Sequence, residues 1–210
     1  MGATIDEILV GDPAKAWAAA GFSVDDDGTC RLGTVRVRLV GRQGGKRILG
    51  WSLRGAPPAR LAVGTLDGLP TTASDRPPAD PARHPNGATH IDHLVLLSPD
   101  LGRTTAALAS IGLEPRGERT TDSYGAPMRQ VFFRLGEVIL ELVGQPKATG
   151  EGEPGFFGVA VSVADLDATA GLLGDHLGAI KDAVQEGRRI ATLRHRDLGM
   201  SVATAFMSPG

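Results

Sequence analysis

Cysteine is almost absent from this 210-residue chain, which contains only Cys30. A single cysteine cannot form a disulfide within the chain, so an apolar core has to hold the fold together. A chain without disulfides fits a reducing compartment, and we expect a cytoplasmic protein. Cys30 has no histidine close to it in the sequence, which argues against a nucleophilic role.

Several other features are missing. No apolar run approaches the roughly 20 residues of a membrane helix, and the opening MGATIDEILVGD lacks the basic and apolar regions of a signal peptide. The formal net charge is −2 and basic residues are spread along the chain, so composition favours neither a nucleic acid nor a membrane partner. Phosphate-loop, G-x-S-x-G and C-x-x-C motifs are absent too.

The chain does contain an internal repeat. Residues 135–144 read LGEVILELVG and residues 32–41 read LGTVRVRLVG, with six of the ten positions identical. Residues 198–207, LGMSVATAFM, are a weaker copy. Upstream of each copy, a short apolar run leads through an Asp-containing turn into an Ala- and Leu-rich stretch that ends at Gly. Three copies of one small unit are therefore predicted.

The middle unit is the clearest. Residues 91–97 are apolar on both faces except at Asp92 and His93, which predicts a buried strand. Pro99 and Asp100 favour a helix start, and Gly112 suits the helix end. Residues 129–135 and 138–143 read as strands joined by a tight turn. The pattern indicates a β-α-β-β-β unit and an α+β fold.

The domain organisation follows from these units. We predict an N-terminal degenerate unit at 1–55, a Pro-rich linker at 56–88, a middle unit at 89–145 and a C-terminal unit at 156–208. The short connection between the last two favours their pairing as one domain. The N-terminal unit is then either an appendage or a partner across a homodimer.

At HIDHLVLLSPDL (90–101), FFRLGEVILELVG (132–144) and GVAVSVADLD (158–167), the sequence resembles the vicinal oxygen chelate superfamily. That superfamily includes glyoxalase I, bleomycin-resistance proteins, extradiol dioxygenases and methylmalonyl-CoA epimerase. The resemblance implies glyoxalase-like β-α-β-β-β repeats, with curved mixed sheets forming a cup-shaped cavity and the helices outside. It covers residues 89–207 well and residues 4–55 weakly.

The resemblance also implies a divalent metal, which would be Zn, Ni, Mn, Fe or Mg. The family's first-strand ligand matches His93, and its last-strand ligand matches Glu141. Counted the same way, the C-terminal unit offers only Gly158 and Thr204, so half of a four-ligand site is missing. The N-terminal unit places Glu7 at the His93 position, which allows a third ligand, but Arg38 at the Glu141 position would pair with Glu7.

Glu141 is the most informative candidate because it is the only charge in an apolar strand. A buried carboxylate needs a cation, a metal or a proton, and Arg129, Arg194 or His93 is a candidate partner. Alternation places Gln130 and Phe132 on one face of the preceding strand. We therefore take Glu141 and His93 as candidate catalytic residues, and Gln130, Phe132 and Arg194 as candidate substrate contacts.

Two functions remain open at this point, besides a third interpretation as a structural or interaction module in which the N-terminal unit serves dimerisation. The first is a metal-dependent lyase, isomerase or dioxygenase of the glyoxalase type that transforms a small organic molecule. The second is a metal-free, non-catalytic binder of a drug or metabolite, as in bleomycin resistance, which the loss of ligands at Gly158 and Thr204 favours. The sequence identifies neither the ligand nor the oligomeric state.

Overall fold

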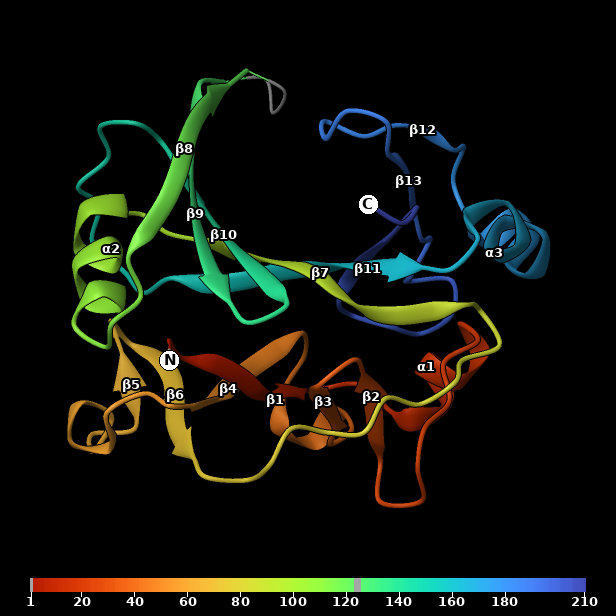
Figure 1. Ribbon diagram of the computed structural model, residues 1–210, viewed down its shortest axis with the longest axis horizontal. Helices are drawn as coiled ribbons and strands as arrows, with labels where there is room; N and C mark the ends of the chain where they lie inside the picture. Colours follow the sequence, from red (N-terminus) through yellow and green to blue (C-terminus); the bar gives the residue numbers. More distant parts are fainter. Residues whose placement is uncertain (1, 123–125) are drawn as a thin grey trace.

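A computed structural model describes residues 2–122 and 126–210 and contains two mixed β-sheets (Figure 1). The first sheet comes from the N-terminal third of the chain. In spatial order its strands are β2 (Thr29–Leu32), β3 (Val35–Leu39), β1 (Thr4–Val10), β4 (Ile48–Arg54), β6 (Leu69–Ser74) and β5 (Thr65–Leu66). One short helix, α1 (Ala14–Ala19), connects β1 to β2.

The second sheet has eight strands and contains the middle and C-terminal repeats. In spatial order they are β12 (Lys181–Asp182), β13 (Arg189–Thr192), β14 (Ala203–Met207), β11 (Gly155–Val163), β7 (Ala88–Leu97), β10 (Val138–Gly144), β9 (Met128–Leu135) and β8 (Pro115–Thr121). Figure 1 shows this sheet curving upward at both ends, with the helices α2 (Leu101–Ala109) and α3 (Leu166–Leu173) outside it. The α+β fold with curved mixed sheets is confirmed.

The two sheets share one strand order. In each, two parallel pairs, β1–β3 with β4–β6 and β7–β10 with β11–β14, are joined by a central antiparallel pair, β1–β4 or β7–β11. The strand β4 therefore does not end the first unit, as its position in the sequence suggested. It begins a second, shortened unit whose other strands, β5 and β6, lie in the segment 56–88. Treating all of that segment as a linker was wrong, because LPTTAS at Leu69–Ser74 pairs in parallel with β4.

The longer helices begin and end where local chemistry requires. The Asp100 carboxylate accepts a hydrogen bond from the backbone N–H of Arg103, and Asp165 caps α3 in the same way through Asp167 and Ala168. Gly112, with φ of 84°, follows the end of α2 in a conformation that favours glycine. Leu101 and Leu108 are buried on one face of α2. None of the helices in the described residues has the length and hydrophobicity needed to cross a membrane.

The first sheet packs beneath the centre of the second (Figure 1). The rings of Trp51 on β4 and Phe156 on β11 meet edge to face, with centroids 5.2 Å apart. Phe22, which follows α1, stacks on Phe206 of β14 at 5.8 Å. The Glu137 carboxylate in the β9–β10 turn accepts a hydrogen bond from the Thr34 backbone N–H at 2.6 Å. One continuous apolar core therefore joins the two sheets.

The packing can be tested through Cys30 on β2, which lies in the core with no exposed surface. Burial raises the pKa of its thiol to about 12. We expect labelling by a thiol reagent at pH 8 to proceed only at the rate of unfolding and to become fast in denaturant. Rapid stoichiometric labelling of the native protein would contradict the packing of β2.

Candidate functional site

The concave face of the eight-stranded sheet carries the candidate residues. Side chains that pair directly across neighbouring strands point to the same face. One such row runs through Phe132, Glu141, Val95, Gly158 and Ala203. The next row runs through Arg134, Ile139, His93, Ala160 and Ala205. The helices α2 and α3 lie outside the curved sheet, away from this face (Figure 1).

His93 is placed by an irregularity in β7. The partners of Ala160 and Val161 are His93 and Ile91, which leaves Asp92 as the extra residue of a β-bulge. The bulge lets two consecutive side chains meet, and Asp92 Oδ1 lies 2.9 Å from His93 Nδ1. The other Asp92 oxygen pairs with Arg188 Nη1 at 2.6 Å and accepts from the Ser162 hydroxyl at 3.2 Å.

The charge state of Asp92 determines which His93 nitrogen carries the proton. Burial acts to raise the pKa of Asp92, but the hydrogen bonds from His93 and Arg188 and the charge of Arg188 outweigh it and hold the pKa well below its usual value. An ionised carboxylate only accepts hydrogen bonds, so His93 Nδ1 must carry the proton. In the neutral ring, His93 Nε2 is then a free acceptor.

Glu141 is held by a side chain of the adjacent strand β9. It is 8% exposed, and its Oε1 accepts a hydrogen bond from Gln130 Nε2. The Gln130 carbonyl oxygen accepts in turn from Arg119 Nε, and the Arg119 guanidinium lies 5.6 Å from the centre of the Phe132 ring. The amide of Gln130 is thereby oriented so that it donates to the carboxylate.

The two halves of this network meet at a gap. His93 Nε2 and Glu141 Oε2 are 4.0 Å apart, which is too far for a direct hydrogen bond. With His93 neutral, both atoms are acceptors, and neither has another partner among the described residues. A hydrogen-bond donor or a cation between them would satisfy both.

The C-terminal half of the concave face is made of small residues. Because Ile139 pairs with His93 and Ala203 pairs with Gly158, the residue that corresponds to Glu141 is Ala205 and not Thr204. Counting from the Leu-Gly pairs was wrong by one residue, and Thr204 is buried on the opposite face. A Cβ at Gly158 would overlap the carbonyl oxygen of Ala203, so this position has no room for a ligating side chain.

The other predicted site residues lie elsewhere. Glu7 is on β1 of the first sheet, where it pairs with Arg38 at 3.6 Å and with Arg76 at 2.9 Å. The structure therefore does not bring Glu7 to His93 and Glu141, and the pairing with Arg38 is confirmed. Arg194 lies beyond β13, is exposed, and makes no side-chain contact that would partner Glu141 within the described chain. Residues 2–122 and 126–210 contain no group of three His, Cys, Asp or Glu side chains able to hold a metal ion.

Sequence reasoning missed three residues of the network. Asp92 was overlooked as the partner of His93 because neighbours in a regular strand point to opposite faces, and only the bulge brings them together. Arg188 lies in the β12–β13 connection, and Arg119 is on β8, a strand that the sequence pattern did not predict. Neither arginine carries a local signal that links it to the site.

Comparison with known proteins supports the fold. No protein-family model matches the chain, and no curated protein matches its sequence. A triple mutant of 4-hydroxymandelate synthase from Streptomyces coelicolor is 12% identical with a TM-score of 0.67, covering 99% of this chain and 92% of the synthase. A fusion of a xylose isomerase-like barrel with 4-hydroxyphenylpyruvate dioxygenase is 12% identical with a TM-score of 0.64, covering 98% of this chain and 48% of the fusion.

A methylmalonyl-CoA epimerase from Mycobacterium tuberculosis is 20% identical with a TM-score of 0.47, covering 59% of this chain and 90% of the epimerase. This likeness is confined to part of the chain. The similarity over almost the whole chain, together with the shared strand order of the two sheets, shows that the protein has the fold of the vicinal oxygen chelate superfamily.

Replacing Asp92 with Asn removes the carboxylate that joins His93 to Arg188. Removing one partner of a buried ion pair costs about 3 kcal/mol, so the free energy of unfolding at pH 7 should fall by about that amount. The folded pKa of Asp92 lies below its unfolded value of 3.8, so its contribution is present above that pH and is lost as the pH falls through the folded pKa. The difference between wild type and Asp92→Asn in urea denaturation should therefore shrink from pH 7 to pH 3.

Asp175→Asn is the matched control because Asp175 is exposed and has no ion-pair partner among the described residues. This variant should follow wild type at both pH values. A difference for Asp92→Asn that stays constant from pH 7 to pH 3 would show that the carboxylate is not held by Arg188 and His93.

Proposed function

We propose that the protein binds a small oxygen-bearing organic molecule on the concave face of its eight-stranded sheet. The observation that carries this proposal is the pair of acceptors, His93 Nε2 and Glu141 Oε2, that face each other at 4.0 Å. A ligand hydroxyl donates to one of these atoms, and a second donor of the ligand or a water molecule satisfies the other. The small residues Gly158, Ala160 and Ala205 leave room for the rest of the molecule beside them.

The same pair supports proton transfer. Asp92 orients the His93 ring and stabilises the imidazolium that forms when Nε2 takes a proton, which is how a carboxylate assists a histidine base. Gln130 holds Glu141 so that its second oxygen points at the same ligand atom. Isomerase and lyase reactions that move a proton next to a carbonyl or hydroxyl group fit this arrangement.

A resident metal fits these residues less well. A tightly held divalent ion in a protein usually has three or four protein ligands, and only His93 and Glu141 are placed to serve. The other half of the sheet offers Gly158 and Ala205, which have no donor side chain, and Gly158 has no space for one. No step of the proposed chemistry therefore passes through a metal, and metal-dependent dioxygenase chemistry is not supported by this ligand set.

The second candidate is a non-catalytic binder of a drug or metabolite. The glycine and alanine residues of the C-terminal half favour a non-catalytic binder, because small residues leave space for a ligand and carry no reactive side-chain group. Phe132 and Arg119 add an aromatic ring and a cation on the concave side. One similar structure, which covers almost the full chain, is a 4-hydroxymandelate synthase, so hydroxy acids, keto acids and aromatic antibiotics are the first ligands to test.

Calorimetry with this panel should give saturable binding of at least one member. Glu141→Gln keeps the shape of the side chain but removes its charge, and His93→Gln removes the imidazole; each should weaken binding of a hydroxyl-bearing ligand about tenfold, as expected for one charge-assisted hydrogen bond. Glu151→Gln, at an exposed site between β10 and β11, is the control and should bind like wild type. Undiminished binding by both site variants would place the ligand elsewhere.

Exchange in deuterated water separates the two candidates. If the pair transfers protons, wild-type protein should catalyse exchange of the hydrogen next to the ligand's carbonyl or hydroxyl group, monitored by NMR. His93→Gln should slow this exchange by at least about a hundredfold, which is the usual contribution of a general base. Saturable binding with no catalysed exchange would favour the non-catalytic binder.

Metal analysis gives a further prediction. After desalting, the purified protein should retain Zn, Ni, Mn, Fe and Mg at well below one equivalent, because two protein ligands hold such ions weakly. His93→Ala and Glu141→Ala should leave the metal content unchanged. One equivalent of a divalent metal in wild type that disappears in Glu141→Ala would overturn the metal-independent proposal.

A further inference from the structure

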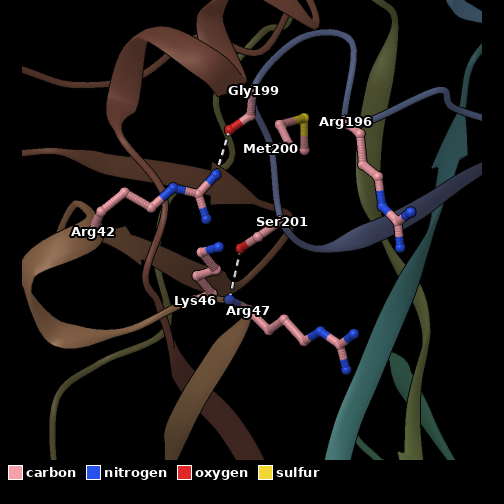
Figure 2. A pocket seen from close by; sticks show the side chains of 7 residues that line it. All are labelled: Arg42, Lys46, Arg47, Arg196, Gly199, Met200 and Ser201. Carbon is pink, nitrogen blue, oxygen red and sulfur yellow. Dashed lines mark hydrogen bonds between the residues drawn. The ribbon is translucent and has the colours of Figure 1, made fainter.

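A second feature lies away from the concave face, where the β3–β4 connection meets the β13–β14 connection. Here the chain encloses a pocket of about 400 Å³ (Figure 2). Its lining consists of Arg42, Lys46, Arg47, Arg196, Gly199, Met200 and Ser201. The first three belong to the first sheet's connection and the others to the second sheet's, so the pocket spans both sheets.

The charge of this pocket is strongly positive. Four of its seven lining residues are cationic, although the whole chain has a formal net charge of −2. Only Arg42 has an ionic partner in the described chain, the Asp12 carboxylate at 3.0 Å, while Lys46, Arg47 and Arg196 pair with no described residue. Like charges gathered without counter-charges repel one another, and an anion between them would relieve that repulsion.

Asp12 does not neutralise the pocket. It has no exposed surface, and besides Arg42 it accepts from the Ser201 backbone N–H at 2.9 Å, the Ser201 hydroxyl at 2.6 Å and Trp17 Nε1 at 3.2 Å. With its oxygens occupied, Asp12 instead holds the wall in place. The other Arg42 terminal nitrogen donates to the Gly199 carbonyl oxygen at 2.6 Å, so this guanidinium is fixed across the junction (Figure 2).

The backbone conformation of Arg47 is a second indication that this pocket is a binding site. Arg47 has a φ of 65°, which is unfavourable for a residue with a side chain. Its N–H donates to the Ser201 hydroxyl at 2.6 Å, so a contact across the junction keeps the residue in that conformation. Strained backbone maintained by its surroundings is common at ligand sites. Figure 2 shows the Arg42 guanidinium on one side of Ser201, with the Arg47 and Arg196 side chains reaching outward on the other side.

We propose that this pocket binds the phosphoryl group of a small phosphorylated molecule. Guanidinium groups match phosphate oxygens with paired donors, and a dianion balances more of the unpaired positive charge than a single carboxylate does. The pocket is large enough for a phosphoryl group together with part of the molecule that carries it. Because the ligand contacts both connections, its binding stabilises the junction of the two sheets.

The test uses the whole 210-residue chain in a buffer of constant ionic strength made up with sodium chloride. Inorganic phosphate, pyrophosphate and a sugar phosphate are titrated by calorimetry, and thermal unfolding is followed in parallel. We expect saturable binding with a rise in Tm, with the sugar phosphate or pyrophosphate binding more tightly than inorganic phosphate if the natural ligand carries an organic group. Tightest binding of inorganic phosphate would assign the pocket to the free ion.

Arg196→Ala and Lys46→Ala each remove one exposed cation, and each should weaken binding about tenfold, the effect of one charge-assisted hydrogen bond. Arg60→Ala, at an exposed position with no ion pair among the described residues, is the matched control and should bind like wild type. Glu141→Gln should also bind phosphate normally, which separates this site from the concave face.

The absence of saturable binding of all three phosphates to folded wild type would overturn the proposal. Equal binding by wild type and by the Lys46→Ala/Arg196→Ala double variant would do the same, provided that circular dichroism shows both to be folded. Binding of a short oligonucleotide without competition from pyrophosphate would replace the small phosphorylated ligand with a polynucleotide.

Discussion

The antiparallel pairing of β7 with β11 is the interaction on which the rest of the structure depends. It joins the middle and C-terminal repeats into one eight-stranded sheet whose outer strands curve toward the same side. The first sheet repeats the arrangement through β1 and β4 and packs beneath this centre. Without the β7–β11 ladder, the concave side chains of the middle repeat would not be aligned with those of the C-terminal repeat. The same ladder contains the bulge that turns Asp92 toward His93.

A chain of alternating charges crosses the concave face from that bulge. Arg188 neutralises Asp92, Asp92 orients His93, and Arg119 orients Gln130 against Glu141. Within this network of described residues each polar side chain therefore has a partner, and only His93 Nε2 and Glu141 Oε2 face each other without a hydrogen bond. The corresponding place in the first sheet has no such gap. Glu7, which corresponds to His93, is paired with Arg38 and Arg76, and its neighbour Asp6 is buried among Arg36, Arg54 and Arg76. Of these two corresponding places, only the one on the second sheet leaves acceptors open to a ligand.

The hydrophobic pattern predicted much of the fold because each repeat encodes its own strands and helix. The strand predicted at residues 91–97 is part of β7, and Asp100 caps the start of α2 as predicted. The hydrophobic pattern did not predict strands that form only because a neighbouring strand pairs with them. The strand β8 is almost wholly exposed and polar, and β6 lies in a proline-rich segment, so neither carries the alternation that marks a half-buried strand. Both form because a paired edge was available, at β9 and at β4.

By itself, the sequence determined the repeating unit and the α+β class, because residue type and spacing along one chain are local properties. It indicated His93 and Glu141 through the resemblance of their motifs to a known superfamily. Tertiary structure decided what those residues can do. Strand register, not counting, placed Ala205 opposite Gly158 and left the second half of the concave face without donors. The cationic pocket between Arg42 and Arg196 joins two connections more than 150 residues apart, with Gly199 accepting from Arg42 across a separation of 157 residues. Contacts of that range depend on how the two sheets pack, which no local pattern records.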